Sequence, residues 1–165
     1  MATSSLSPEV FRRVMGSFAT GVTVITVERA PGLVHGMTAN SFTSVSLDPV
    51  LVLVCVDQNA RLLGYLKAQR RFGVNVLRAG QRDISDFFAK PQQEPAMEAH
   101  LGVRFQWTAS GIPLLGDSLA NLACRVVAEH QTGDHTIFIG EVESLDLAEG
   151  QPLLYYRGQY RSLQD

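Results

Sequence analysis

The sequence predicts a mainly β protein, a β-barrel with short helices packed around it. Runs of β-branched and other apolar residues recur along the whole chain, and several of them are separated only by a turn. The regular alternation of strands and helices that builds a parallel sheet is missing. The 165 residues, 45% of them hydrophobic, suffice for one domain. We expect this domain to span residues 1–165, with its core at about 8–163.

The first predicted element is an amphipathic helix over residues 8–18. Ser7 supplies a capping hydroxyl, Pro8 occupies the first helical position, and apolar side chains then recur at helical spacing. Gly21 is expected to end this helical segment. Residues 22–27 follow as a strand, because β-branched side chains pack well on a pleated surface.

Residues 34–46 carry hydroxyl and amide groups at alternating and adjacent positions, and we expect one strand here. Residues 48–49 separate it from a strand of apolar residues, 50–56. A buried hydroxyl or amide without a partner costs about 1–3 kcal/mol. One interpretation is therefore a planar ligand that hydrogen-bonds to the Asn40 amide and to backbone groups of residues 39–41. The other is an edge strand whose polar side faces water.

The rest of the chain continues this pattern of strands and short helices. Asn59 is expected to cap a helix that begins directly after it. A turn at residues 132–134 is typical of a hairpin. The other expected helices cover residues 84–88 and 95–101, and the other expected strands cover residues 72–77, 103–108, 121–131, 135–145 and 153–156.

A second candidate site follows the apolar strand, at Asn59, Ala60 and Arg61. The start of a helix presents unpaired N–H groups and a partial positive charge. The guanidinium group of Arg61 adds a cation whose forked geometry suits a phosphate. This pattern indicates a phosphate cradle, and the alternative is a surface arginine at an ordinary helix start.

Two more candidates lie late in the chain. His135 follows the predicted hairpin turn, where it either faces a ligand at the mouth of the barrel or is an ordinary exposed histidine. Residues 155–160 combine tyrosines with an arginine. This mixture suits stacking on a nucleotide ring, although aromatic residues near a C-terminus also close cores and interfaces.

Several classes of function lack support in the sequence. The 14 basic and 16 acidic residues are scattered, so we expect no nucleic-acid binding. The four histidines show no metal-ligand spacing, and the common nucleotide, hydrolase and zinc motifs are missing. Cys55 and Cys124 lie in apolar runs, which is typical of core thiols in a reducing compartment. No apolar run approaches about 20 residues, so we expect a cytoplasmic protein without a membrane span or leader.

Five motifs, in this order and spacing, resemble the small NAD(P)H-dependent flavin reductases that serve two-component flavin monooxygenases. They are residues 18–26, 36–49, 72–77, 133–135 and 152–158. The resemblance extends from Phe11 to Leu163. It implies an FMN-binding split β-barrel, usually a homodimer, that transfers a hydride from NADH or NADPH to FMN or FAD. The reduced flavin would then pass to a separate oxygenase.

The resemblance also implies roles for particular residues. The flavin ring and its ribityl chain would lie along Thr38, Ala39, Asn40, Ser41, Ser44 and Val45. The phosphate would lie at Asn59, Ala60 and Arg61, and the nicotinamide at His135, Tyr156, Arg157 and Gly158. Hydride transfer needs no protein nucleophile or obligatory base, so these residues would orient the reactants and stabilise the charge on the reduced ring.

Three other functions remain open at this point. The first is a flavin-binding barrel that holds its cofactor tightly and does not turn over. The second is an oxidase of the pyridoxamine-phosphate type, for which the sequence offers no dedicated substrate pocket. The third is a structural barrel subunit, which would leave the polar clusters and the hairpin histidine without a common explanation.

Overall fold

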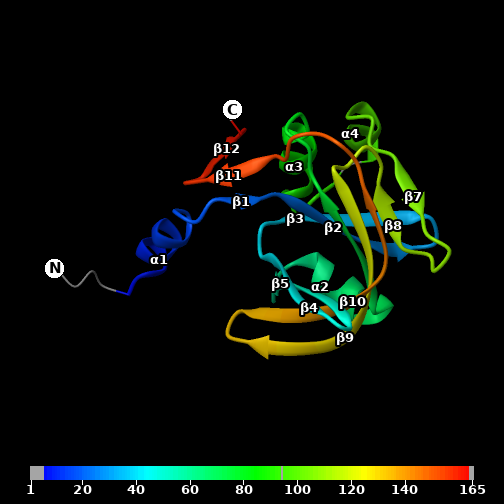
Figure 1. Ribbon diagram of the computed structural model, residues 1–165, viewed down its shortest axis with the longest axis horizontal. Coiled ribbons are helices and arrows are strands. Elements are labelled where there is room, and N and C mark those ends of the chain that lie inside the picture. The colour runs from blue at the N-terminus through cyan, green and yellow to red at the C-terminus, as the bar shows by residue number, and fades with distance from the viewer. Residues whose placement is uncertain (1–5, 94, 164–165) are drawn as a thin grey trace.

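The centre of the protein is a seven-stranded antiparallel sheet that curls into a barrel (Figure 1). The computed structural model describes residues 6–93 and 95–163. The strand order is β3-β2-β6-β9-β10-β5-β4. These strands are β2 (Thr23–Ala30), β3 (Leu33–Ala39), β4 (Phe42–Leu47), β5 (Val50–Asp57), β6 (Arg71–Val76), β9 (Ala120–Thr132) and β10 (His135–Leu147). The prediction of a mainly β protein is confirmed.

Smaller elements surround the barrel. A three-stranded sheet contains β1 (Thr20–Gly21), β11 (Leu154–Tyr156) and β12 (Gln159–Arg161), and a two-stranded sheet contains β7 (Phe105–Trp107) and β8 (Pro113–Leu115). The helices are α1 (Pro8–Met15), α2 (Arg61–Gln69), α3 (Arg82–Phe88) and α4 (Pro95–His100). The helices among the described residues are all too short or too polar to cross a lipid bilayer.

Two hydrophobic cores lie on opposite faces of β2. Inside the barrel, Ile25 packs with Phe72 and Phe138, and α2 lies in the curve of the sheet with Leu62 and Leu66 fully buried (Figure 1). The second core lies on the other face of β2. It contains Val22, Val24, Leu77, Phe87, Phe88, Leu115 and Leu153. Residues 23–27 of β2 are all buried, and the hydroxyls of the two threonines among them, Thr23 and Thr26, donate to the Ala39 and Pro113 carbonyls.

The expected single strand over residues 34–46 is wrong. The structure forms two strands, β3 and β4, which pair with β2 and β5 and lie at opposite edges of the seven-stranded sheet. The chain crosses between the edges at Asn40 and Ser41, where the Cys55 N–H donates to the Ser41 carbonyl at 3.1 Å. Most side chains of β4 are exposed, which fits its position at the edge of the sheet.

The first helix is shorter than expected. The Ser7 hydroxyl accepts a hydrogen bond from the Val10 N–H at 3.2 Å, which confirms the cap, but the helix ends at Met15. Gly21 does not end it, since Thr20 and Gly21 form β1. The apolar side chains of α1 are not buried, and Figure 1 shows the helix standing away from the barrel.

Other boundaries also differ from the predictions. Asn59 does not cap α2, because the cap position is Ala60, which makes no side-chain bond. The Asn59 Nδ2 instead donates to Asp57 Oδ1 at 3.2 Å. β1, β8 and β12 were not expected, and the strand predicted at 103–108 is shorter. The hairpin turn is confirmed, with Gly133 at φ 60° between β9 and β10.

Candidate functional site

Two adjacent hollows lie along β3 and share Ala89. The smaller one, about 180 Å³, is here called the tyrosine hollow and is lined by Val22, Thr38, Ala39, Asn40, Ser85, Ala89, Tyr155 and Tyr160. The larger one, about 300 Å³, is called the histidine hollow. Its lining comprises His35, Gly36, Met37, Asn59, Ala60, Arg61, Leu62, Phe88, Ala89, Lys90, Pro91 and Gln93. One strand therefore runs along both spaces.

The unpaired edge of β3 faces these hollows. The Gly36 N–H donates to Gln93 Oε1 at 3.3 Å, and Gln93 Nε2 donates to the Gly36 carbonyl at 2.6 Å. Gly36 thus points its backbone groups away from β2. In an antiparallel strand, the backbone N–H and carbonyl groups of every second residue point to the same side. Thr38 lies two residues after Gly36, so its N–H and carbonyl also point to the open edge. The Ala39 carbonyl instead accepts from the Thr23 hydroxyl at 2.7 Å.

Side chains from distant segments form the walls of the tyrosine hollow. Tyr155 and Tyr160 pack edge to face with ring centres 5.5 Å apart. The Tyr160 hydroxyl donates to Asp86 at 2.9 Å and lies 2.8 Å from the Ser85 hydroxyl, which therefore donates to it. Burial is the main cause that raises the pKa of Tyr160. The Thr38 hydroxyl is occupied by the Ser85 carbonyl at 2.7 Å, so it does not face a ligand as a donor.

The histidine hollow is electropositive. Arg61 and Lys90 bring two cations to its lining. Burial, followed by the charges of Arg29 and Arg61, lowers the pKa of His35 from 6.5 to about 4, so this imidazole is neutral at pH 7. Its ring lies 5.4 Å from the ring of Tyr65. The hollow therefore suits an anionic group such as a phosphate.

Glycine is required at position 36 by a close approach. A Cβ atom there would lie 2.4 Å from the ring of Phe88. This contact sets α3 directly against β3, and the residues that follow α3 then cover the histidine hollow. Gln93 holds this segment to the strand edge through its two bonds to Gly36.

His135 lies next to the predicted phosphate segment. The Gln58 N–H donates to the Asp134 carbonyl at 2.9 Å, and Gln58 Nε2 donates to the Thr136 hydroxyl at 2.7 Å. The hairpin tip is thus attached to the chain that leads into Asn59. His135 Nδ1 lies 2.7 Å from Asp134 Oδ1, and this hydrogen bond is the main cause that lowers the pKa of Asp134.

The C-terminal candidates lie at the turn between β11 and β12. Side chains alternate along a strand, so Tyr155, which lines the tyrosine hollow, and Tyr156 point in opposite directions. The Arg157 N–H donates to the Gly16 carbonyl at 2.8 Å, next to α1. Arg157 and Gly158 both adopt positive φ, at 50° and 76°.

The structure does not bring every predicted residue to the two hollows. The Ser41 hydroxyl donates to the Cys55 carbonyl at 2.8 Å. Ser44 and Val45 lie on the exposed part of β4. Among the described residues, these three line neither hollow. Their roles remain predictions from the resemblance. The described residues also contain no group of three or more histidine, cysteine or acidic side chains that could hold a metal ion.

Several lining residues were not singled out from the sequence. They are His35, Ser85, Lys90 and Gln93. Tyr155 and Tyr160, which also line the tyrosine hollow, belong to the segment 155–160 that the sequence indicated for stacking on a nucleotide ring. Ser85 and Gln93 lie more than 45 positions along the chain from their partners in β3, which are Thr38 and Gly36. Local periodicity contains no information on such contacts.

Known proteins share this fold and sequence. Residues 15–164 match the flavin reductase like domain. The NADH-dependent flavin reductase of Rhodococcus sp is 44% identical over 165 residues, which cover 96% of this chain and 90% of that protein. The reductase subunit HsaB of a flavin-dependent monooxygenase from Mycobacterium tuberculosis is 37% identical over 164 residues, which cover 98% of this chain and 85% of that protein.

A solved structure extends the comparison to bound ligands. The NADH:FAD oxidoreductase SgcE6 of Streptomyces globisporus C-1027, in complex with NAD and FAD fragments, matches with a TM-score of 0.85 and 37% identity. The match covers 98% of both chains. The split-barrel fold expected from the resemblance is confirmed. The chain belongs to the flavin reductase-like domain family.

Proposed function

We infer that the protein is an NADH-dependent flavin reductase. It oxidises NADH, reduces FMN or FAD, and serves as the reductase of a two-component monooxygenase. The observation that carries this function, beside family membership, is the position of β3. Its open edge faces a hollow walled by aromatic rings at one end and a hollow with two cations at the other.

The described residues fit a flavin mononucleotide group. The open N–H and carbonyl at Thr38 complement the alternating donors and acceptors on the pyrimidine edge of the ring. The Asn40 amide makes no hydrogen bond within the described part of the chain and supplies a further donor and acceptor. Arg61 and Lys90 would hold the phosphate in the histidine hollow, beside Asn59 and Ala60. The neutral His35 there can accept or donate a hydrogen bond.

The residues of the chain orient the reactants. A bound flavin would supply N5 as the acceptor for a hydride from C4 of the nicotinamide ring. Tyr155 and Tyr160 form an aromatic wall against which planar rings stack. His135, held by Asp134, and the turn at Tyr156, Arg157 and Gly158 are the groups that we assign to the nicotinamide side. The dipoles at the β3 edge would stabilise the charge on the reduced pyrimidine ring.

A stopped-flow assay tests this function. The purified protein, mixed without oxygen with NADH and either FMN or FAD, should oxidise NADH only when a flavin is present. NADPH in the same assay ranks the two nicotinamides. Absence of flavin-dependent oxidation with both nicotinamides contradicts the function. A yellow protein that retains flavin without oxidising NADH indicates the binding protein instead.

We also propose that the protein is a homodimer. The support is the exposed apolar surface of α1, where Phe11 and Val14 are each 63% exposed. An eight-residue helix is unstable in water by itself, so a packing partner is needed. A second copy of this chain supplies an equivalent helix and sheet in a twofold arrangement.

The whole chain is proposed to act as one domain in the cytoplasm. The support for a single domain is that residues of both hydrophobic cores lie on β2, so the barrel and the elements outside it pack against the same strand. Cys55 and Cys124 are free thiols, which fits a reducing compartment.

A further inference from the structure

We propose that Ser85 and Asp86 are positioning residues for hydride transfer, because they fix the aromatic wall at Tyr160 relative to the open edge of β3. Three hydrogen bonds connect these two sides of the tyrosine hollow through α3, which lies beside the β11–β12 hairpin (Figure 1). The proposal rests on NADH oxidation as the function. It assigns to α3 the spacing between a ring bound at the edge and a ring stacked on the wall.

Ser85 is bonded to both sides of the tyrosine hollow. Its carbonyl accepts from the Thr38 hydroxyl at 2.7 Å, and its hydroxyl lies 2.8 Å from the hydroxyl of Tyr160. Ser85 is fully buried, so water does not compete for either bond. Buried polar groups rarely remain without a partner, and both bonds are therefore expected to persist when the hollow is occupied. One residue thus fixes the edge of β3 and the wall relative to each other.

Asp86 fixes the direction of these bonds. Burial is the main cause that raises the pKa of Tyr160, so its hydroxyl is protonated at pH 7 and has one proton to donate. The acceptor of this proton is the Asp86 carboxylate at 2.9 Å, because an ionised carboxylate only accepts. The Ser85 hydroxyl then donates to the Tyr160 oxygen. With a donor on one side and an acceptor on the other, the Tyr160 hydroxyl is held in one place.

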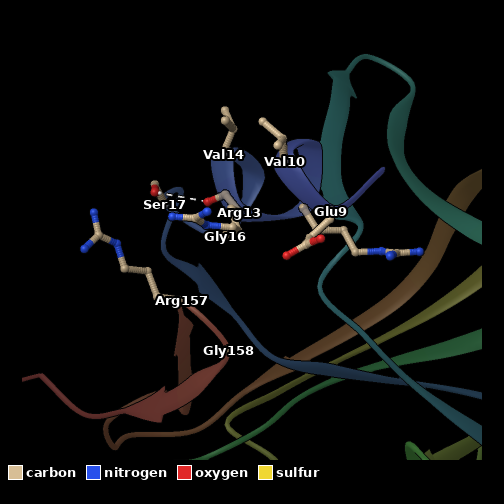
Figure 2. Close-up of a pocket in the computed structure, with 9 residues that line it drawn as sticks. Glu9, Val10, Arg13, Val14, Gly16, Ser17, Arg157 and Gly158 are labelled. Carbon is tan, nitrogen blue, oxygen red and sulfur yellow. Dashed lines mark hydrogen bonds between the residues drawn. The ribbon is translucent and has the colours of Figure 1, made fainter. Parts of the chain in front are cut away.

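The wall depends on this attachment because Tyr160 stands on an edge strand. β12 has three residues and pairs only with β11, at the end of the sheet β1-β11-β12. At the turn of this hairpin, the Arg157 N–H donates to the Gly16 carbonyl at 2.8 Å, and Figure 2 shows the turn beside Gly16. Within the described part of the chain, Tyr160 makes the side-chain hydrogen bonds that join β12 to another element. A short segment with so few bonds opens locally when they are lost.

Arg82 braces the same ring. Its guanidinium lies over the Tyr160 ring, 5.3 Å from the ring centre, and its Nε lies 3.6 Å from Asp86 Oδ2. Arg82 lines a separate hollow that also contains Tyr160, so it contacts the ring from outside the tyrosine hollow. A cation over an aromatic face is attracted to it. The first turns of α3 therefore hold Tyr160 both by its hydroxyl and by its ring.

Hydride transfer depends steeply on how the two rings are placed. Reacting atoms need a separation of about 3–3.5 Å, and a displacement of about 1 Å reduces the rate about 100-fold. In the proposed complex the edge of β3 and the wall at Tyr160 contact the reactants from different sides, so the spacing between them affects the rate. The bonds of Ser85 and Asp86 should therefore change the rate of hydride transfer more than the affinity for either reactant.

The experiment compares Tyr160→Phe with the wild-type protein in single-turnover and steady-state assays. This variant keeps the aromatic ring and removes the hydroxyl that α3 holds. We expect the rate constant of hydride transfer to fall about tenfold, because the wall is no longer fixed. The KM for NADH and the dissociation constant of FMN should change less than about twofold, since the ring remains available for stacking.

A double variant separates positioning from folding stability. Tyr160→Phe leaves the buried Ser85 hydroxyl without its partner and should lower the free energy of unfolding. Tyr160→Phe combined with Ser85→Ala removes both partners and should recover most of that loss. If the bonds position the wall, the double variant still transfers hydride slowly although its stability recovers. Urea unfolding measures the stability of each variant.

Variants of Asp86 provide a second comparison. Asp86→Ala removes the acceptor of the Tyr160 hydroxyl and should slow hydride transfer about threefold, less than Tyr160→Phe does, because the bond from Ser85 remains. Asp86→Asn keeps an oxygen acceptor and should recover most of the rate. Asp83→Ala removes an exposed acid from the first turn of the same helix and should behave as wild type.

Two results would overturn the proposal. One is a Tyr160→Phe protein with the wild-type rate of hydride transfer. The other is recovery of both rate and stability in the double variant, which would mean that the bonds act only through folding. A wild-type protein that does not oxidise NADH contradicts the proposed function instead. Hydrogen exchange of the β12 amides then still tests the attachment, since Tyr160→Phe should exchange faster and equal exchange overturns the proposal.

Discussion

Arg61 is the residue on which the proposed phosphate end of the flavin site depends most. It is an exposed cation at the first position of α2 and lines the histidine hollow. We expect Arg61→Gln to raise the dissociation constant of FMN about tenfold, because a hydrogen bond to a charged group contributes about 1.5 kcal/mol. Quenching of flavin fluorescence measures this constant.

The controls for Arg61 come from the same helix and from the ligand. Lys67→Gln removes a cation in the last turn of α2 and should leave FMN binding unchanged. Riboflavin lacks the phosphate, so its affinity should be equal in the wild type and in Arg61→Gln. A comparable loss of affinity for riboflavin would show that Arg61 does not act through the phosphate.

His35 makes stability depend on pH. Its pKa is about 4 in the folded protein and 6.5 without perturbation, mainly because of burial. Between these values the unfolded chain binds a proton that the folded protein does not, so the free energy of unfolding falls as pH decreases from 6.5 to about 4. The full effect is about 3 kcal/mol, at 1.36 kcal/mol per pKa unit. Above pH 6.5 the His35 side chain is neutral in both the folded and the unfolded state, so it no longer makes the free energy of unfolding depend on pH.

Urea unfolding at pH 7 and pH 4.5 measures this contribution. His35→Phe cannot titrate, so its free energy of unfolding should decrease less between the two pH values than that of the wild type. His130→Gln, at an exposed histidine of β9, should keep the wild-type difference. Equal differences in wild type and His35→Phe would contradict the assignment.

Among the larger elements, the segment after α3 is held in place mainly by Gln93. Its side chain makes two bonds to Gly36 and one, at 3.4 Å, to the Lys90 carbonyl. Gln93→Ala should therefore release the cover of the histidine hollow and raise the flavin dissociation constant about fivefold, since each net bond contributes about 1 kcal/mol. Gln92→Ala, at the exposed neighbour, is the matched control. Equal affinities of the two variants would mean that the cover does not contribute to binding.

β8 is attached to the barrel by the buried amide of Asn75. Its Nδ2 donates to the Val24 carbonyl at 2.7 Å, and its Oδ1 accepts from the Leu115 N–H at 2.7 Å. Asn75→Leu should lower the free energy of unfolding by about 3 kcal/mol, because buried groups lose their partners. Gln106→Leu on β7 is exposed and should change it by less than about 0.5 kcal/mol. Urea unfolding of both variants provides the measurement.

For the whole molecule, the main prediction concerns the dimer. If α1 packs on a second copy, a charge at Phe11 would be buried without a partner, so Phe11→Glu should shift the protein to monomers. Leu33→Glu is a control at the start of β3, where the side chain is 49% exposed. Analytical ultracentrifugation distinguishes the two states. A wild-type protein that sediments as a monomer contradicts the dimer.

Local patterns predicted the individual elements better than their arrangement. The Ser7 cap, the β-branched run of β2 and the turn at Gly133 each depend on neighbours in the sequence, and the structure confirms all three. The expected strand over 34–46 failed because alternation of side chains does not specify which strand becomes the partner. Asn59 failed as a cap because α2 begins one residue later than expected, so Ala60 occupies the cap position.

The sequence by itself determined the mainly β class and the family, since both depend on residue types and their order along the chain. It also indicated Thr38, Ala39, Asn40, Asn59, Ala60 and Arg61, which line the two hollows. Only the tertiary structure placed β3 at an open edge and brought Tyr160, Lys90 and Gln93 to it. These contacts join segments that are distant in sequence. They form because burial of apolar side chains in the two hydrophobic cores brings those segments together.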